Sequence, residues 1–128
     1  MLPLLQEGRD LFTVSRKGSE RCRVGDVVLF RRNGKYILHR VVKVWEDSYD
    51  CLGDNAVNKE FGVKDSDILG VLESFTRKGK KHLVTALGYR IYSMTWVYSY
   101  PIRIIVKRTL LALKHKISWW FKWRMKNN

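Results

Sequence analysis

The sequence predicts a mainly β fold, with a β domain over residues 1–85 and a basic, amphipathic helical extension over residues 86–128. Two observations predict this class. Short apolar runs of strand length alternate with turn residues in the first part, with no helix between them, as in antiparallel or mixed all-β domains. In the second part apolar residues recur at intervals of three and four, the spacing of an amphipathic helix. A chain of 128 residues can bury one modest hydrophobic core.

Five segments of the first part have the length and composition of strands. The dipeptide Asn33-Gly34, the strongest short hairpin signal, joins the second segment to the third. A further turn is predicted at Lys78-Gly79-Lys80, after the last segment. The predicted strands are residues 11–15, 27–30, 36–45, 49–52 and 67–75.

The second part is predicted to form one helix over residues 99–125. Pro is favoured in the first turn of a helix, so Ser99-Tyr100-Pro101 is predicted to start it. The preceding residues 82–98 fit a strand end followed by a short helix or an irregular apolar segment. The apolar side of the predicted helix carries Ile102, Ile105, Val106, Leu110, Leu113, Ile117 and Trp120.

Charge is divided unevenly along the chain. Residues 1–75 contain 12 Lys and Arg and 12 Asp and Glu, whereas residues 76–128 contain 13 Lys and Arg and no acidic residue. The formal net charge of +13 therefore comes entirely from the second segment. This distribution excludes a uniformly basic protein of the histone or ribosomal kind and suggests an anionic partner for the second segment.

Cysteine content and hydropathy indicate the compartment. Cys22 and Cys51 are too few for a disulfide framework or a four-ligand zinc site, so two reduced thiols are expected, with a single bridge left open. The N-terminus lacks the basic region of a signal peptide. The longest uncharged stretch of the cationic segment, residues 91–102, is shorter than the roughly 20 apolar residues of a spanning helix. A cytoplasmic or peripheral membrane location is predicted.

The Trp-rich cationic helix admits three interpretations: packing on the β domain, binding to a membrane surface, or binding to nucleic acid. Trp combined with Lys and Arg on one amphipathic helix is typical of the membrane interface, so an anionic membrane surface is the favoured partner. Nucleic acid is the least favoured, because no reader motif is present. The predicted contact residues are Arg103, Lys107, Arg108, Lys114, Trp119, Trp120 and Trp123.

Three short motifs of the first part have residue types suited to chemistry. The chain starts with Met1-Leu2-Pro3; a Gly-Asp-Val-Val-Leu-Phe segment at residues 25–30 is followed nine residues later by His39-Arg40-Val41-Val42; and Gly53-Asp54-Asn55 precedes an Ile-Leu-Gly-Val segment at residues 68–71. In this order and spacing the motifs resemble the LexA/signal-peptidase superfamily of serine peptidases, over residues 1 to about 72.

The resemblance implies a role for each motif residue. His39 stands where the endoplasmic-reticulum and archaeal branch has its catalytic His, and Asp54 stands at the acidic partner of that branch. Glu60 occupies the position of a second family Asp, six residues further on, and is a carboxylate of different length. Met1 and Pro3 fall in the motif that follows the nucleophile and are assigned to substrate binding.

The nucleophile of this family is a Ser immediately before the motif Met, a position that would precede Met1. Two explanations compete: the sequence starts at the motif Met because its beginning is missing, which is favoured because His39 and Asp54 are both present, or the chain is a natural pseudo-peptidase. In either case the 128 residues are predicted to be inactive on their own, since Ser15, Ser19 and Ser48 lie outside the motif.

The chemistry of these residue types agrees with the resemblance. A Ser hydroxyl is a weak nucleophile that needs a base within hydrogen-bond reach. A neutral His can accept its proton at pH 7, and a carboxylate can orient the imidazole and stabilise the imidazolium. No metal or cofactor is predicted, because the sequence has neither zinc-ligand spacing nor a phosphate loop.

Two functions follow as hypotheses. The first is a signal-peptidase-like serine peptidase domain that hydrolyses a peptide bond of a peptide or protein substrate through an acyl-enzyme. The alternative is a non-catalytic pseudo-peptidase that binds extended peptides by strand addition and docks on a membrane or protein partner through its basic tail. Neither the cleavage site nor the oligomeric state is predicted.

Overall fold

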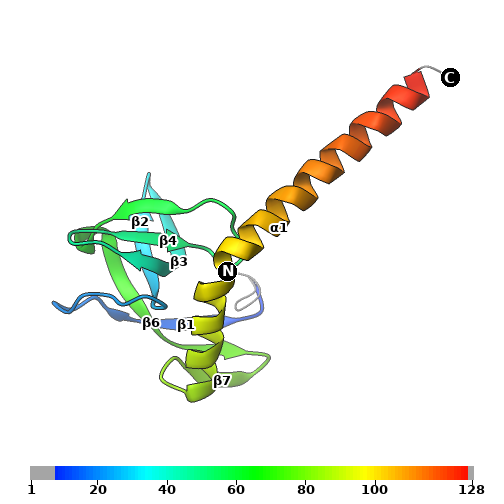
Figure 1. The fold of residues 1–128 in the computed structure, drawn as a ribbon. Coiled ribbons are helices and arrows are strands. Elements are labelled where there is room, and N and C mark those ends of the chain that lie inside the picture. The colour runs from blue at the N-terminus through cyan, green and yellow to red at the C-terminus, as the bar shows by residue number, and fades with distance from the viewer. Residues whose placement is uncertain (1–7, 127–128) are drawn as a thin grey trace. The chain divides into compact units, whose positions relative to one another are not determined.

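The structure is a computed structural model that describes residues 8–126. It confirms the predicted class, a mainly antiparallel β protein with one C-terminal helix (Figure 1). A single turn of 3-10 helix, η1, interrupts the strands at Asp65–Asp67. The elements are β1 (Leu11–Arg16), β2 (Val27–Arg32), β3 (Lys35–Val44), β4 (Tyr49–Leu52), β5 (Glu60–Val63), β6 (Ile68–Arg77), β7 (Lys80–Leu83) and α1 (Leu87–Lys126).

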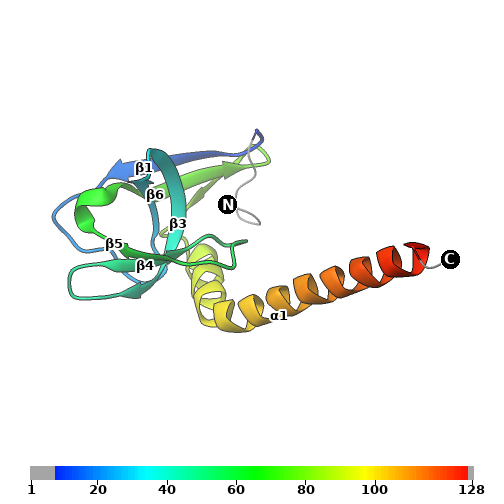
Figure 2. The ribbon, with the colours of Figure 1, turned by 90° about the horizontal axis from the view of Figure 1, so that it is seen from above.

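The strands form one seven-stranded sheet in the order β1-β6-β2-β3-β4-β5, and β7 pairs with β6. All of these pairings are antiparallel. Strand β6 pairs with three other strands. Strand β1 pairs along one edge of β6, while β2 pairs with the first residues of β6 and β7 with its last residues. The sheet curls, so that β1 and β6 lie on one side and β4 and β5 on the other (Figure 2).

The predicted hairpin at Asn33-Gly34 is confirmed. Asn33 has φ 51° and Gly34 φ 76°, the paired left-handed conformations of a type I′ turn, whose twist matches that of the flanking strands. This turn sets the register in which Val28 faces His39 and Val27 faces Arg40 across β2 and β3. The register of β2 and β3 is therefore set by two consecutive residues of the sequence.

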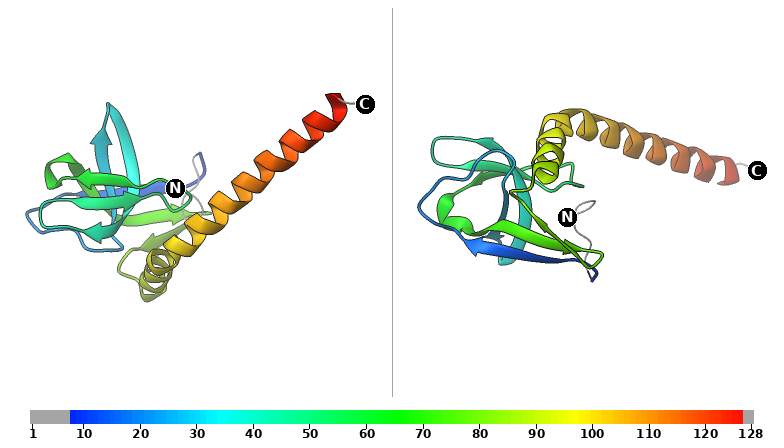
Figure 3. Two further views of the ribbon diagram at one scale, coloured as in Figure 1. Left: turned by 45° about the horizontal axis from the view of Figure 1, so that its top comes forward. Right: turned by 90° about the horizontal axis from the view of Figure 1, so that it is seen from below.

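The predicted start of the helix at Ser99 is wrong. Helix α1 begins at Leu87, and Pro101 lies inside it. The reason is tertiary: side chains in the first turns of α1, Tyr89 and Tyr92, pack on the sheet, and this burial favours a helix in a segment whose sequence pattern was ambiguous. Figure 3 shows these first turns, in yellow-green, beside the strands.

Two strands lie outside the five predicted segments, although the second of them, β7, includes residues 82 and 83, where a strand end is predicted. Strand β5 is a four-residue segment containing Gly62, and β7 has the sequence Lys-Lys-His-Leu with every residue exposed. In β5 the apolar alternation is limited to Phe61 and the buried Val63, which is too short to predict a strand, and β7 has no alternation. Backbone pairing to a neighbour, β5 to β4 and β7 to β6, holds each of them.

The chain divides into two compact units, Met1–Tyr98 and Ser99–Asn128. The first unit extends past residue 85, where the sequence analysis placed the boundary, because it includes the start of α1. The second unit consists of the remainder of α1 and the last residues of the chain. Among the described residues, no helix combines the length and apolar character needed to cross a membrane.

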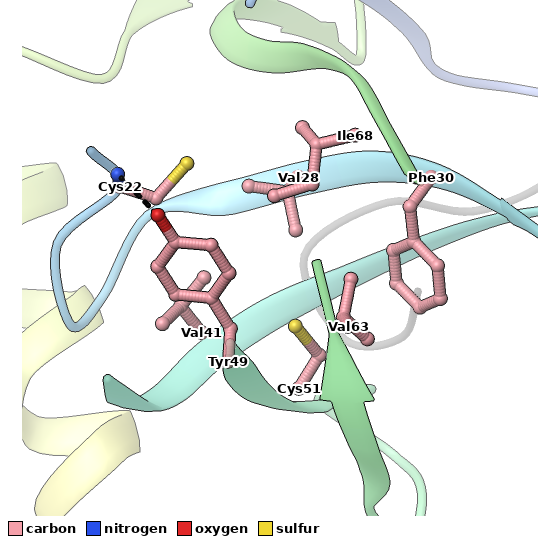
Figure 4. Close-up of a cluster of buried hydrophobic side chains, with 8 residues drawn as sticks. All are labelled: Cys22, Val28, Phe30, Val41, Tyr49, Cys51, Val63 and Ile68. Atoms are coloured by element: carbon pink, nitrogen blue, oxygen red, sulfur yellow. Dashed lines mark hydrogen bonds between the residues drawn. The ribbon is translucent and has the colours of Figure 1, made fainter. Parts of the chain in front are cut away.

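The first unit has two clusters of buried side chains. The larger one lies inside the curl of the sheet and includes Phe30, Val41 and both cysteines (Figure 4). The smaller one, Val27, Leu72 and Phe75, is covered by Tyr89 and Tyr92 of α1. The strands between them therefore present alternate side chains to two different environments.

The hydroxyl of Tyr49 links the larger cluster by hydrogen bonds to the segment between β1 and β2 and to η1. It accepts a hydrogen bond of 3.2 Å from the backbone N–H of Cys22 (Figure 4). It also donates one of 2.7 Å to Asp65. Cys22 and Cys51 are free and buried, and burial raises the pKa of Cys22 and raises that of Cys51 to about 12. Both thiols are therefore protonated at neutral pH and are not activated nucleophiles.

Candidate functional site

The candidate site is built on β3, where His39 and Arg40 point to opposite faces of the sheet. Successive side chains of a strand alternate between faces. His39 pairs in register with Val28, a member of the cluster inside the curl, and Arg40 pairs with Val27, a member of the cluster under α1. One dipeptide therefore supplies a side chain to each face.

The imidazole of His39 lies against the cluster inside the curl. It is half-buried, and its ring lies edge to face with the ring of Phe30, with 6.1 Å between the ring centroids. Its Nδ1 is buried and has no hydrogen-bond partner among the described residues. A buried polar atom without a partner is rare in proteins and marks a group that another atom must satisfy.

Gly53 lies close to the Nε2–Cδ2 edge of the His39 ring. A Cβ at this position would lie 2.8 Å from Nε2 and 3.0 Å from Cδ2 of His39, closer than side-chain contacts permit. The absence of a side chain at Gly53 therefore allows the turn after β4 to approach the ring. The β3–β4 pairing, in which Arg40 faces Leu52, brings the next residue, Gly53, alongside His39.

Burial lowers the pKa of His39 from its ordinary value of 6.5, and the charge of Glu60 opposes this effect. Asp54 also opposes it, but less strongly than Glu60. The imidazole is therefore neutral at pH 7, the protonation state that a general base requires.

On the opposite face, Arg40 forms a buried, bidentate ion pair with Asp54. Its Nε and Nη2 donate to the two carboxylate oxygens, each at 2.9 Å, and the two side chains are each only 1% exposed. Nη1 of Arg40 donates to Ser93 Oγ at 2.7 Å and to the carbonyl oxygen of Gly25 at 3.0 Å. The guanidinium therefore joins three segments: the turn before β2, the turn after β4 and the start of α1.

Aromatic side chains of α1 complete this network. Tyr92 donates its hydroxyl hydrogen to Asp54 at 3.3 Å, and the indole N–H of Trp96 donates to the backbone carbonyl of Asp54 at 3.2 Å. The rings of Tyr89 and Tyr92 lie 5.8 and 5.6 Å from the guanidinium carbon of Arg40. Burial lowers the pKa of Arg40, but the hydrogen bonds and charge of Asp54 outweigh this and raise it, so Arg40 remains charged.

The predicted site residues are thus brought together in part. His39 and the Gly53-Asp54 turn are in contact, but no hydrogen bond joins His39 to Asp54 among the described residues, and the Asp54 carboxylate binds Arg40. Glu60, on β5, accepts a hydrogen bond of 2.8 Å from Arg32. The catalytic assignments of Asp54 and Glu60 stay predictions. Met1 and Pro3 lie outside the described residues.

Arg40 belongs to the His39-Arg40-Val41-Val42 motif, but the sequence pattern alone assigns it no role. The signal that could have found it is strand alternation: if His39 points to one face, its neighbour must point to the other, where a charged residue needs a buried partner. Asp54 follows the Gly that contacts His39, so it is placed to be that partner.

Two further features of the described residues are relevant to a functional site. No group of three or more His, Cys, Asp or Glu side chains in residues 8–126 is arranged to hold a metal ion. A hollow of about 900 Å³ lies in the first unit, but Ser93 and Tyr89 of the Arg40 network border it and His39 does not. This hollow and the candidate base are therefore separate features.

The predicted contact residues of the basic segment all lie on α1. Nε of Arg103 donates to Ser99 Oγ at 3.3 Å, one turn earlier. The side chains of Trp119, Trp120 and Trp123 are exposed, and the guanidinium of Arg124 lies 5.2 Å from the Trp120 ring. Lys107, Arg108 and Lys114 are on the same helix.

Comparison with protein-family models, with curated proteins and with solved structures found no match to this chain. We therefore infer the function from the geometry of the site and from the motif pattern of the sequence.

Replacing Arg40 by Met should destabilise the protein by about 3–5 kcal/mol, because it leaves the buried Asp54 carboxylate unpaired. The matched control is Arg32→Met on β2, which breaks an ion pair of similar length whose side chains are 28% and 33% exposed. That change should cost about 0–1 kcal/mol. Urea denaturation measures both, and equal losses would show that the Arg40–Asp54 pair has no special structural role.

The pKa of His39, measured by NMR titration, should lie below 6.5 and should fall further in Glu60→Gln, because this change removes the charge that raises it. Glu73→Gln, an exposed carboxylate on β6, is the control and should leave the titration unchanged. Because the folded-state pKa is depressed, His39 should reduce the free energy of unfolding as the pH falls below about 6.5. A His39 pKa above 6.5, or one insensitive to Glu60→Gln, would contradict this description of the site.

Proposed function

We propose that the first unit is a signal-peptidase-like serine peptidase domain in which His39 is the general base. The observation that carries the proposal is the state of His39: half-buried, neutral at pH 7, packed against Gly53, and with Nδ1 lacking a partner among the described residues. A base of this kind is what a Ser nucleophile requires.

The reaction assigned to the complete site is acyl transfer. The Ser hydroxyl gives its proton to the imidazole as its oxygen bonds to the carbonyl carbon of the peptide bond. The imidazolium then gives the proton to the departing amine nitrogen, which leaves an acyl-enzyme. Water attacks this ester with His39 again as base, releasing the acid and restoring Ser. We assign Nδ1 of His39, which has no partner among residues 8–126, to the Ser hydroxyl.

The two carboxylates support the base in different ways. The Asp54 carboxylate is held by Arg40, so it acts on His39 through its charge and through the position of Gly53. Glu60 has the larger effect on the pKa of His39, and its charge would stabilise the imidazolium formed during the reaction. Both roles belong to the proposal, with a peptide or protein as the substrate.

The nucleophile can be tested by placing Ser directly before Met1, behind a Gly-Ala leader that adds no other hydroxyl. A fluorophosphonate probe should label this variant at the added Ser and should not label the 128-residue chain. His39→Gln in the Ser variant should slow labelling by at least about 100-fold, the usual contribution of a general base. Intact-mass spectrometry and peptide mapping measure the extent and place of labelling.

Two controls make this experiment specific. Ala in place of the added Ser should abolish labelling, and His115→Gln, on an exposed position of α1, should leave it unchanged. Labelling of the original chain at Ser15, Ser19 or Ser48 would show that the site is misplaced. A folded Ser variant that the probe does not label would favour the non-catalytic, peptide-binding alternative.

A further inference from the structure

We propose that residues 99–126 of α1 bind the surface of an anionic lipid bilayer, with the helix lying along the interface. This inference is independent of the proposed peptidase activity, since it concerns the second compact unit. It is carried by the charge of this segment, by its exposed apolar side chains and by the position of its aromatic residues.

The charge of the segment has one sign. Residues 99–126 contain no Asp or Glu, so no acidic side chain within the segment neutralises its bases. A surface of this charge attracts an anionic partner, and each basic residue close to an anionic membrane raises binding by about fivefold. The basic residues are Arg103, Lys107, Arg108, Lys114, Lys116, Lys122, Arg124 and Lys126.

The same helix exposes large apolar side chains, which a purely electrostatic interaction would not need. Trp119 is 69% exposed, Ile102 67% and Leu110 60%. Apolar residues spaced by three and four positions lie along one side of a helix. Those with this spacing are Ile102, Ile105, Val106, Leu110, Leu113, Ile117, Trp120 and Phe121, and each is at least 45% exposed.

Three features favour a membrane surface over other partners. The bases Arg103, Lys107 and Lys114 follow a neighbouring side of the helix, so apolar and cationic groups can reach the acyl boundary and the headgroups together. Three of the five Trp residues lie in the last turns, and Trp is enriched at membrane–water interfaces. The segment is too charged to span the bilayer, which leaves the interfacial orientation.

Arg124 is an exception to the separation of basic and apolar side chains on α1. Helical spacing places it on the apolar side itself, five turns after Val106, where a charge would be costly. Its guanidinium lies 5.2 Å from the Trp120 ring, and a long Arg side chain can extend beside an aromatic ring to keep its charge at the headgroups.

The test is binding of the full chain to vesicles of phosphatidylcholine with 30% phosphatidylserine, compared with pure phosphatidylcholine. Co-sedimentation should show strong binding to the anionic vesicles that weakens in 0.5 M NaCl, because exposed charges are screened at high ionic strength. Trp emission should shift to the blue, and brominated lipids should quench it. Quenching distinguishes insertion at the interface from attraction at a distance.

Two triple variants isolate the charge. Arg103→Gln, Lys107→Gln and Lys114→Gln together should weaken binding on the order of 100-fold, at about fivefold for each charge. The matched control removes three exposed lysines of the first unit, Lys35, Lys43 and Lys80, and should weaken binding by less than about fivefold. Equal losses in the two variants would show that net charge alone drives binding and would overturn the proposal.

A third variant isolates the aromatic residues. Trp119→Ala, Trp120→Ala and Trp123→Ala together should abolish lipid quenching and weaken vesicle binding at least tenfold. Equal binding to neutral and anionic vesicles, or no binding to either, would overturn the proposal. So would displacement from vesicles by single-stranded RNA at equal phosphate concentration, or a dimer in sedimentation that the Trp variant dissociates, since these results assign the surface to nucleic acid or to a second copy of the chain.

Discussion

The buried ion pair between Arg40 and Asp54 is the interaction on which the first unit depends. Removing two charges from water costs free energy. Their mutual attraction offsets this cost only when every remaining hydrogen-bond donor and acceptor of the pair is satisfied. Here the guanidinium also donates to Ser93 and to the carbonyl of Gly25, so the pair requires the start of α1 and the turn before β2 to be in place. A polar network of this kind fixes one arrangement of these segments rather than adding much net stability.

The pair also determines what surrounds the candidate base. Asp54 and Gly53 are adjacent in the turn after β4, as Arg40 and His39 are adjacent on β3. When Arg40 binds Asp54 on one face, Gly53 is held against His39 on the other. The lowered pKa of His39 therefore follows from an arrangement that is stabilised on the opposite side of the sheet. An ion pair distant from the chemistry can act as a positioning element in this way.

The parts of the fold that local chemistry determines could be predicted from the sequence. The Asn33-Gly34 turn and the apolar strands around it are examples, because their signals lie in consecutive residues. Strand β5 and the first half of β7 could not, since pairing to a neighbouring strand holds them and most of their side chains are exposed. The early start of α1 is a tertiary effect of the same kind, because it depends on the burial of Tyr89 and Tyr92.

The candidate site also has a part that could be predicted from the sequence and a part that depends on tertiary structure. Motif order identified His39 and Asp54 as candidate residues, but it could not show that Asp54 would bind Arg40, because that choice depends on which face each side chain occupies.

The close approach of Gly53 to His39 can be tested by NMR titration of His39 in two variants, Gly53→Ala and Gly18→Ala, the second of which adds a methyl group in open space. Gly53→Ala should displace the imidazole and move the pKa of His39 up toward 6.5, while Gly18→Ala should leave it unchanged. Identical titrations of His39 in the two variants would contradict this close approach.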